Sequence, residues 1–131
     1  IRRGVPEDLV TSVLSRLRYL VPSDQLLSMA KARSLWEALT RFSQTMLYSK
    51  IQRVLGLTPA TIDELSVALK RLVRVEAESI LTAPAFNIGA AIAISLVKEY
   101  EVEDLTLIST GIEYGISMKH IANMMVFFEA A

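Results

Sequence analysis

The residues with the most obvious chemical potential are four closely spaced carboxylates, Glu99, Glu101, Glu103 and Asp104. A pair of carboxylates can act as general acid and base, but no Gly-rich phosphate loop accompanies these four. The sequence has 0 Cys and a single His, His120. Cysteine nucleophiles, thiolate metal sites and multi-histidine metal sites are therefore excluded. We interpret the carboxylates as an acidic helix face and predict no catalytic, metal-binding or cofactor-binding residue.

Four arginines near the start of the sequence form the second group of interest: Arg2, Arg3, Arg16 and Arg18. They could contact phosphates, but no interleaved aromatic residues support nucleic-acid binding. We expect them to meet an acidic partner surface, whereas Glu99, Glu101, Glu103 and Asp104 could orient basic groups of a partner. For Glu101 and Leu105 we favour structural packing over a partner contact. Three further basic residues, Lys70, Arg71 and Arg74, predict a solvated face or a contact with an acidic partner.

The overall charge is balanced but unevenly distributed. The 131 residues carry 14 basic and 14 acidic side chains, which argues against a constitutive nucleic-acid binder. Residues 1–53 hold nine basic and four acidic residues (+5), and the remainder holds five basic and ten acidic residues (−5). This asymmetry indicates either two different contact faces or attraction between the halves of one fold.

The elements that must position these side chains are predicted to be helices almost throughout. Hydrophobic residues make up 52% of the sequence, with only 5 Gly and 4 Pro, and they recur at helical rather than alternating spacing. We predict an all-α bundle or helical repeat of about six helices. The expected signals are a start at Pro6, a stop at Pro22, caps at Ser23, Ser34 and Ser117, a Gly56 stop, a restart at Thr58-Pro59, a break at Thr82 to Pro84, and a helix from Ala85 to Thr110.

Two properties of the helix predicted from Ser34 to Gly56 stand out. Its apolar residues, such as Trp36, Leu39 and Tyr48, fall on more than one face, which is typical of a helix packed on two sides. It is also predicted to be continuous.

The sequence shows no sign of a membrane span or a secretion signal. No segment has the length of an apolar membrane span, and no signal peptide is visible. The absence of an initial Met suggests that the chain begins inside a longer gene product.

A faint internal echo links the two ends of the chain. Ile1-x-x-Gly4-Val5 with Val10 matches Ile112-x-x-Gly115-Ile116 with Ile121, at a constant offset of 111 residues. Both places have the pattern of a helix end, a Gly stop and a helix restart. If the echo reflects a structural repeat, the chain runs from the end of one repeat to the end of the next.

The stretch from Pro84 to Gly115 carries a family resemblance. Pro84-Ala85-Phe86-Asn87-Ile88-Gly89 leads into Lys98-Glu99-Tyr100-Glu101-Val102-Glu103-Asp104-Leu105, then Ile108, Gly111 and Gly115. This resembles the C-terminal repeat of the C subunit of prokaryotic V-type (A-type) ATPases, the counterpart of the eukaryotic d subunit. The segments from Arg3 to Leu20 and from Ser34 to Tyr48 are compatible with helices of the same family.

The resemblance implies an arrangement and a role. Proteins of this family are funnel-shaped and built of three helical repeats. The chain, taken as one helical domain, would comprise the tail of the middle repeat (1–32) and the C-terminal repeat (33–131). The implied function is that of a non-catalytic socket, cytoplasmic and peripheral to the membrane, which couples the central shaft to the membrane rotor ring in proton or sodium transport. The implied partners are the shaft subunits and the ring, and no cofactor is implied. We also expect self-association, because a chain cut from a three-repeat subunit exposes surface that is normally buried between repeats.

The chain also departs from the family pattern. The family's Asn is Asp104 here, its Arg is Thr106, and the basic residue after the first Gly is Ile112. Loss of the Arg removes a bidentate donor, so we expect no guanidinium contact with a partner at Thr106. Two alternatives from other classes remain: a general helical adaptor, and a helical nucleic-acid-binding domain that uses the basic N-terminal half.

Overall fold

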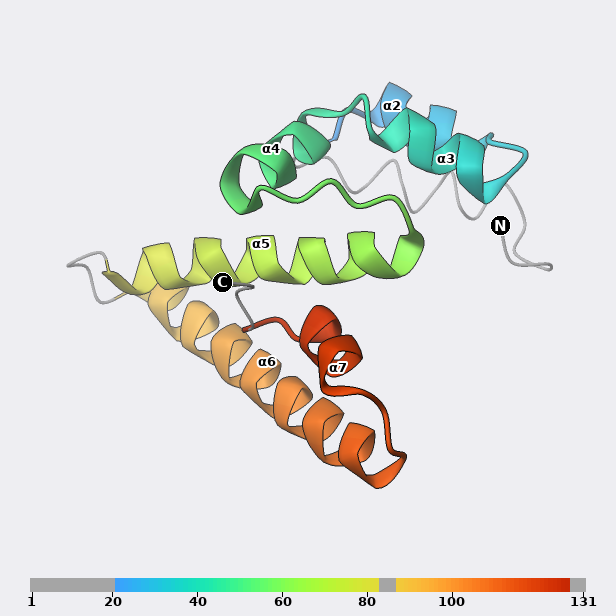
Figure 1. The fold of residues 1–131 in the computed structure, drawn as a ribbon. Helices are drawn as coiled ribbons and strands as arrows, with labels where there is room; N and C mark the ends of the chain where they lie inside the picture. The colour runs from blue at the N-terminus through green and yellow to red at the C-terminus, as the bar shows by residue number, and fades with distance from the viewer. Residues whose placement is uncertain (1–20, 83–86, 128–131) are drawn as a thin grey trace. The chain divides into compact units, whose positions relative to one another are not determined.

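The computed structural model describes residues 21–82 and 87–127, in which six α-helices and no strand are found. This confirms the all-α prediction. The helices are α2 (Ser23–Ala30), α3 (Leu35–Phe42), α4 (Met46–Leu55), α5 (Ile62–Thr82), α6 (Ile88–Glu113) and α7 (Met118–Met124) (Figure 1). The helix predicted after Pro6 and the first copy of the echo, Ile1 to Val5, lie outside the described residues.

The chain divides into two compact units, residues 1–62 and 63–131. This division falls at the start of α5, within the predicted C-terminal repeat 33–131. The proposed repeat boundary at residue 32 stays a prediction. Each unit is described by itself below.

In the first unit, α3 begins at a side-chain cap, whereas α2 does not. The Oγ of Ser34 accepts a hydrogen bond from the backbone N–H of Glu37 (3.1 Å), as a capping box requires. The Glu37 carboxylate reaches back to the N–H of Arg33 (2.8 Å) rather than that of Ser34. For α2, the predicted cap was wrong: Pro22, one residue before Ser23, occupies the N-cap position, and no side chain caps that helix.

The prediction of one unbroken helix from Ser34 to Gly56 is wrong, because the helix is interrupted at residues 43–45. Thr45 is extended (φ −83°, ψ 156°) and caps α4 by accepting from the N–H of Tyr48 (3.3 Å). The ring of Tyr48 then meets Phe42 of α3 edge-on, with centroids 6.0 Å apart. α3 and α4 are therefore separate helices. α4 ends as predicted at Gly56, whose φ of +65° is left-handed.

In the second unit, α5 and α6 meet near one end and diverge, and α7 lies between their open ends (Figure 1). α5 starts at Ile62, three residues after Pro59, and ends at Thr82 as the Thr82 to Pro84 break predicts. α6 is capped by Asn87, whose side chain accepts from the N–H of Ala90 (3.1 Å). It is one continuous helix, as predicted, although displaced by about one turn toward the C-terminus.

α7 returns along α6 through a close approach at Gly111. After Gly115, with a left-handed φ of +66°, Ser117 caps α7 by accepting from the N–H of His120 (3.3 Å), which confirms the predicted Gly stop and Ser cap. A Cβ on Gly111 would stand 2.5 Å from Cδ1 of Ile121. Ile121 is fully buried, so the absence of a side chain at residue 111 lets α7 lie against α6.

Candidate interaction surface

The four carboxylates of α6 do not form one site, because they point to different surroundings. Glu99 is exposed. Glu101 pairs with Lys98 one turn before it on the same helix, with 2.7 Å between Nζ and Oε2. Glu103 reaches Lys70 of α5 at 2.5 Å. Asp104 alone is buried, with 6% of its surface exposed. The helical period places Glu99 and Glu103, one turn apart, on one side of α6, whereas Glu101 and Asp104 point in other directions.

Asp104 holds the segment that follows α7. Its two carboxylate oxygens each accept one backbone hydrogen bond, Oδ1 from the N–H of Val126 and Oδ2 from the N–H of Phe127, both at 2.8 Å. Bonds to a charged acceptor are stronger than neutral ones, and the two amides have no regular helix to join at this point. The carboxylate therefore fixes the chain direction after Met125.

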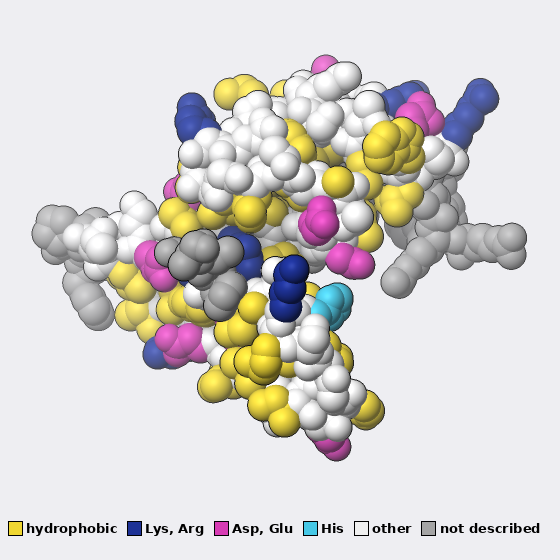
Figure 2. Space-filling model, viewed as in Figure 1, with side chains coloured by type: hydrophobic (Ala, Val, Ile, Leu, Met, Phe, Trp, Pro, Cys, Tyr) yellow, Lys and Arg dark blue, Asp and Glu magenta, His cyan; other side chains and the backbone are white. Residues whose placement is uncertain are grey.

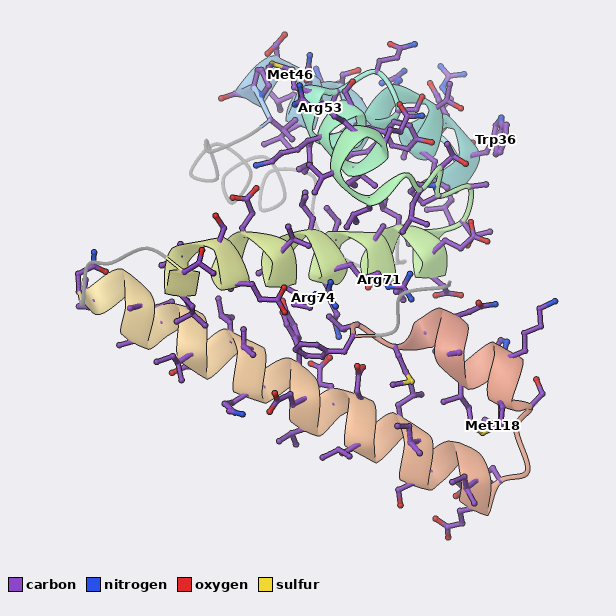
Figure 3. The ribbon with its side chains drawn as sticks, turned by 60° about the vertical axis from the view of Figure 1, so that its left-hand side comes forward. Trp36, Met46, Arg53, Arg71, Arg74 and Met118 are labelled. Atoms are coloured by element: carbon purple, nitrogen blue, oxygen red, sulfur yellow. The ribbon has the colours of Figure 1, made fainter. Side chains whose placement is uncertain are left out.

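Two arginines of α5 hold the same segment by its carbonyl groups, and Figure 3 shows both side chains pointing toward it. Arg71 donates to the carbonyl of Met125 from Nε (3.0 Å) and from Nη2 (2.8 Å). Arg74 donates to the carbonyl of Val126 (3.5 Å), and its guanidinium lies 5.3 Å from the centre of the Phe127 ring. We call Arg71, Arg74 and Asp104 the clasp.

Burial shapes the electrostatics of the clasp. It lowers the pKa of Arg71, as does the neighbouring charge of Arg74, whereas Asp104 raises it. The guanidinium nevertheless stays charged at any physiological pH. The prediction that this basic group is a solvated face is wrong for Arg74, which is only 7% exposed. The Val126 carbonyl, the Glu78 carboxylate at 3.8 Å from Nε and the Phe127 ring, rather than water, surround its charge.

The clasp is a structural cluster rather than a reaction centre. Its polar groups are directed at the backbone of the chain's own C-terminal segment, which leaves them no evident substrate. Sequence reasoning singled out Asp104 and the basic group separately. It missed their common target, because Asp104 and Val126 are 22 residues apart and Arg74 and Val126 are 52 apart.

The surface open to a partner lies on the outer side of α6 and at its end. Figure 2 shows hydrophobic side chains gathered over the α6–α7 part of the second unit, where Leu105, Ile112, Tyr114 and Met118 are exposed. Along one side of α6, Ser95, Glu99, Val102 and Thr106 line a shallow, open depression. This mixed apolar and acidic surface is suited to binding another protein.

The predicted basic contact residues Arg2, Arg3, Arg16 and Arg18 lie outside the described residues. Within the described part of the first unit, Lys31, Arg33 and Arg53 are exposed. No group of three His, Asp or Glu side chains in residues 21–82 and 87–127 could hold a metal ion. Over the same residues, no helix combines the length and apolar character that a membrane span requires.

Comparison with known proteins gives one match. Residues 2–124 match the model of the family described as ATP synthase (C/AC39) subunit. No curated protein and no solved structure matches the chain. The match spans all six described helices and includes the stretch from Lys98 to Gly115 on which the sequence resemblance rests. The chain therefore belongs to the ATP synthase (C/AC39) subunit family, to which the C subunit of V/A-type ATPases and its counterpart, the d subunit, belong.

Proposed function

We propose that this chain is a central-stalk component that couples the rotating shaft of a V/A-type ATPase to the membrane rotor ring during proton or sodium transport. The observation that carries the proposal is the family match over residues 2–124, because this family is a non-catalytic part of the ATPase complex. On this proposal the chain lies on the cytoplasmic side, peripheral to the membrane, and its partners are the shaft subunits and the ring.

The described surfaces suit such a part. A coupling element must keep its shape under load, and α5 and α6, of 21 and 26 residues, are held together by the Lys70–Glu103 ion pair and the clasp. It also needs two contact surfaces of different character. Basic side chains are exposed on the first unit, and the mixed apolar and acidic side of α6 is exposed on the second.

Direct binding tests the proposal. We expect the full chain, immobilised, to retain both the purified shaft subunits and the detergent-solubilised rotor ring. Glu99→Lys should weaken one of these two interactions, more at low than at high salt, because an exposed charge acts through a screened field. Asp63→Lys reverses an exposed charge of α5, away from the α6 surface, and serves as the control.

Two results would count against the proposal. Retention of neither the shaft nor the ring removes the coupling role and favours a general helical adaptor. Retention of nucleic acid with a steep salt dependence, in place of the ATPase subunits, favours the nucleic-acid-binding alternative.

A further inference from the structure

α6 presents two parallel stripes, of which its own unit covers only one. The inner stripe repeats at alternating three- and four-residue steps and contains the buried residues Ala90, Ala93, Asp104 and Gly111. Gly111 meets α7, and Asp104 holds the segment that follows it. These steps are the heptad spacing of a helix that packs along another element over its length.

A second stripe with the same spacing lies beside the first and is largely exposed. It is made of Ala91, Ile94, Lys98, Glu101, Leu105 and Ile108, and it continues to Ile112. Ile94, Leu105 and Ile112 are 44%, 66% and 64% exposed. We call it the outer seam. A helix that is apolar on more than one side is normally covered on more than one side.

The order of residues along the outer seam is self-complementary. Its centre falls between Lys98 and Glu101, which carry opposite charges. Stepping outward from that centre, Ile94 corresponds to Leu105, and Ala91 corresponds to Ile108. When the seam is laid antiparallel against a copy of itself, Lys98 therefore faces Glu101 and apolar residues face apolar residues. In a parallel alignment, Lys98 would face Lys98 and Glu101 would face Glu101.

We propose that the outer seam pairs α6 with α6 of a second copy of this chain, antiparallel, about a two-fold axis between Lys98 and Glu101. Lys98 and Leu105, at first positions of the heptad, then face Glu101 and Ile94 of the other copy, at fourth positions. Knobs-into-holes packing of antiparallel helices requires this pairing. The Lys98–Glu101 pair, 2.7 Å apart within one chain, becomes a four-charge cluster flanked by two Ile94–Leu105 layers. The apolar layers supply affinity, and the charges select the direction and the register.

The first test is the mass of the full chain in solution across a concentration series, by light scattering and sedimentation. The wild-type chain of 14.5 kDa should double in mass as its concentration rises. Leu105→Glu should raise the dissociation constant at least about 30-fold, because a central interface residue is lost in both copies. Ile92→Glu is the matched control: Ile92 is also exposed on α6, but it lies off the seam, and the variant should dimerise normally.

The second test probes the charges. Lys98→Glu should weaken the dimer, because it places like charges opposite each other. The double variant Lys98→Glu/Glu101→Lys should restore the dimer, since it exchanges the charges and keeps the pattern self-complementary. Far-UV circular dichroism of each variant separates loss of pairing from loss of folding.

The third test fixes the direction and uses the fact that the chain has 0 Cys. A mixture of Ile94→Cys and Leu105→Cys chains should form a mixed disulfide, whereas neither variant alone should cross-link, because its two thiols would lie about 16 Å apart along the helix axis. A wild-type mass that stays monomeric, equal effects of Leu105→Glu and Ile92→Glu, or efficient Ile94→Cys homodimers would each overturn the proposal. These readouts do not involve the ATPase, so they are independent of the proposed coupling function.

Discussion

Asp104 shows how one side chain can determine the path of a whole segment. Both of its oxygens accept backbone N–H groups after α7, and the two arginines of the clasp hold the carbonyl groups of the same segment. The family pattern has Asn at this position. In this chain a carboxylate is the better fit, because two donors converge on it and an amide side chain offers only one acceptor oxygen.

The first prediction follows from this geometry. Asp104→Asn should leave one of the two buried N–H groups facing an amide NH₂, which costs about 1–3 kcal/mol. We expect a lower free energy of unfolding in urea and faster amide hydrogen exchange at Val126 and Phe127. Glu99→Gln, an equally conservative change at an exposed carboxylate, should shift stability by less than about 0.5 kcal/mol. Equal effects of the two variants would contradict the role of the clasp.

The second prediction concerns alkaline pH. Burial raises the pKa of the Tyr100 phenol above its usual value of 10.0; Lys70 opposes this shift, and Glu103 and Glu99 add to it. Because the unfolded phenol then loses its proton first, stability should fall as the pH rises above about 10. In Tyr100→Phe this contribution is absent, so urea midpoints should fall less steeply between about pH 9 and 11. Identical slopes for both proteins would rule out the effect.

At the scale of the elements, local signals predicted most helix ends correctly. The Ser34 cap, the Gly56 stop, the break after Thr82 and the Ser117 cap all depend on neighbouring residues. The interruption at residues 43–45 was not predictable in this way. Leu39, Phe42 and Met46 continue the helical period across it, and the turn is accompanied by a contact between Phe42 and Tyr48.

The third prediction tests the cap of α3. Ser34→Ala removes the acceptor for the N–H of Glu37 and should lower stability by about 1 kcal/mol. Ser34→Asp keeps an acceptor at the same position and should restore it. Hydrogen exchange at Glu37 measures the local effect. Equal exchange rates in the alanine and aspartate variants would show that the cap contributes nothing.

The fourth prediction tests the contact between α6 and α7. In Gly111→Ala the new Cβ meets Ile121, and overpacking of about 1–3 kcal/mol should exceed the roughly 1 kcal/mol that alanine gains in a helix. Ile121→Ala removes both side-chain atoms that would crowd that Cβ, Cδ1 at 2.5 Å and Cγ1 at 2.8 Å. The double variant should therefore be more stable than the sum of the single effects predicts, as thermal unfolding can measure. Additive effects would contradict the contact.

At the scale of the whole molecule, the family could be inferred from one stretch of sequence, whereas the contacts that the residues of this stretch make could not. The pattern from Lys98 to Gly115 agrees with the family match over residues 2–124. Their closeness in sequence groups Glu99, Glu101, Glu103 and Asp104 as one acidic face. Their separation into an ion pair within α6, a link to α5 and a buried clasp depends on partners up to 33 residues away. Sequence spacing contains no direct information on such distances.

The central claim, that the chain couples shaft rotation to ion transport, is tested most directly by the ratio of ions transported to ATP hydrolysed. The measurement compares reconstituted complexes assembled with and without the full chain. We predict that hydrolysis continues without the chain while transport is lost, and that adding the chain restores the ratio. Undiminished transport per ATP in complexes that lack the chain would contradict the account.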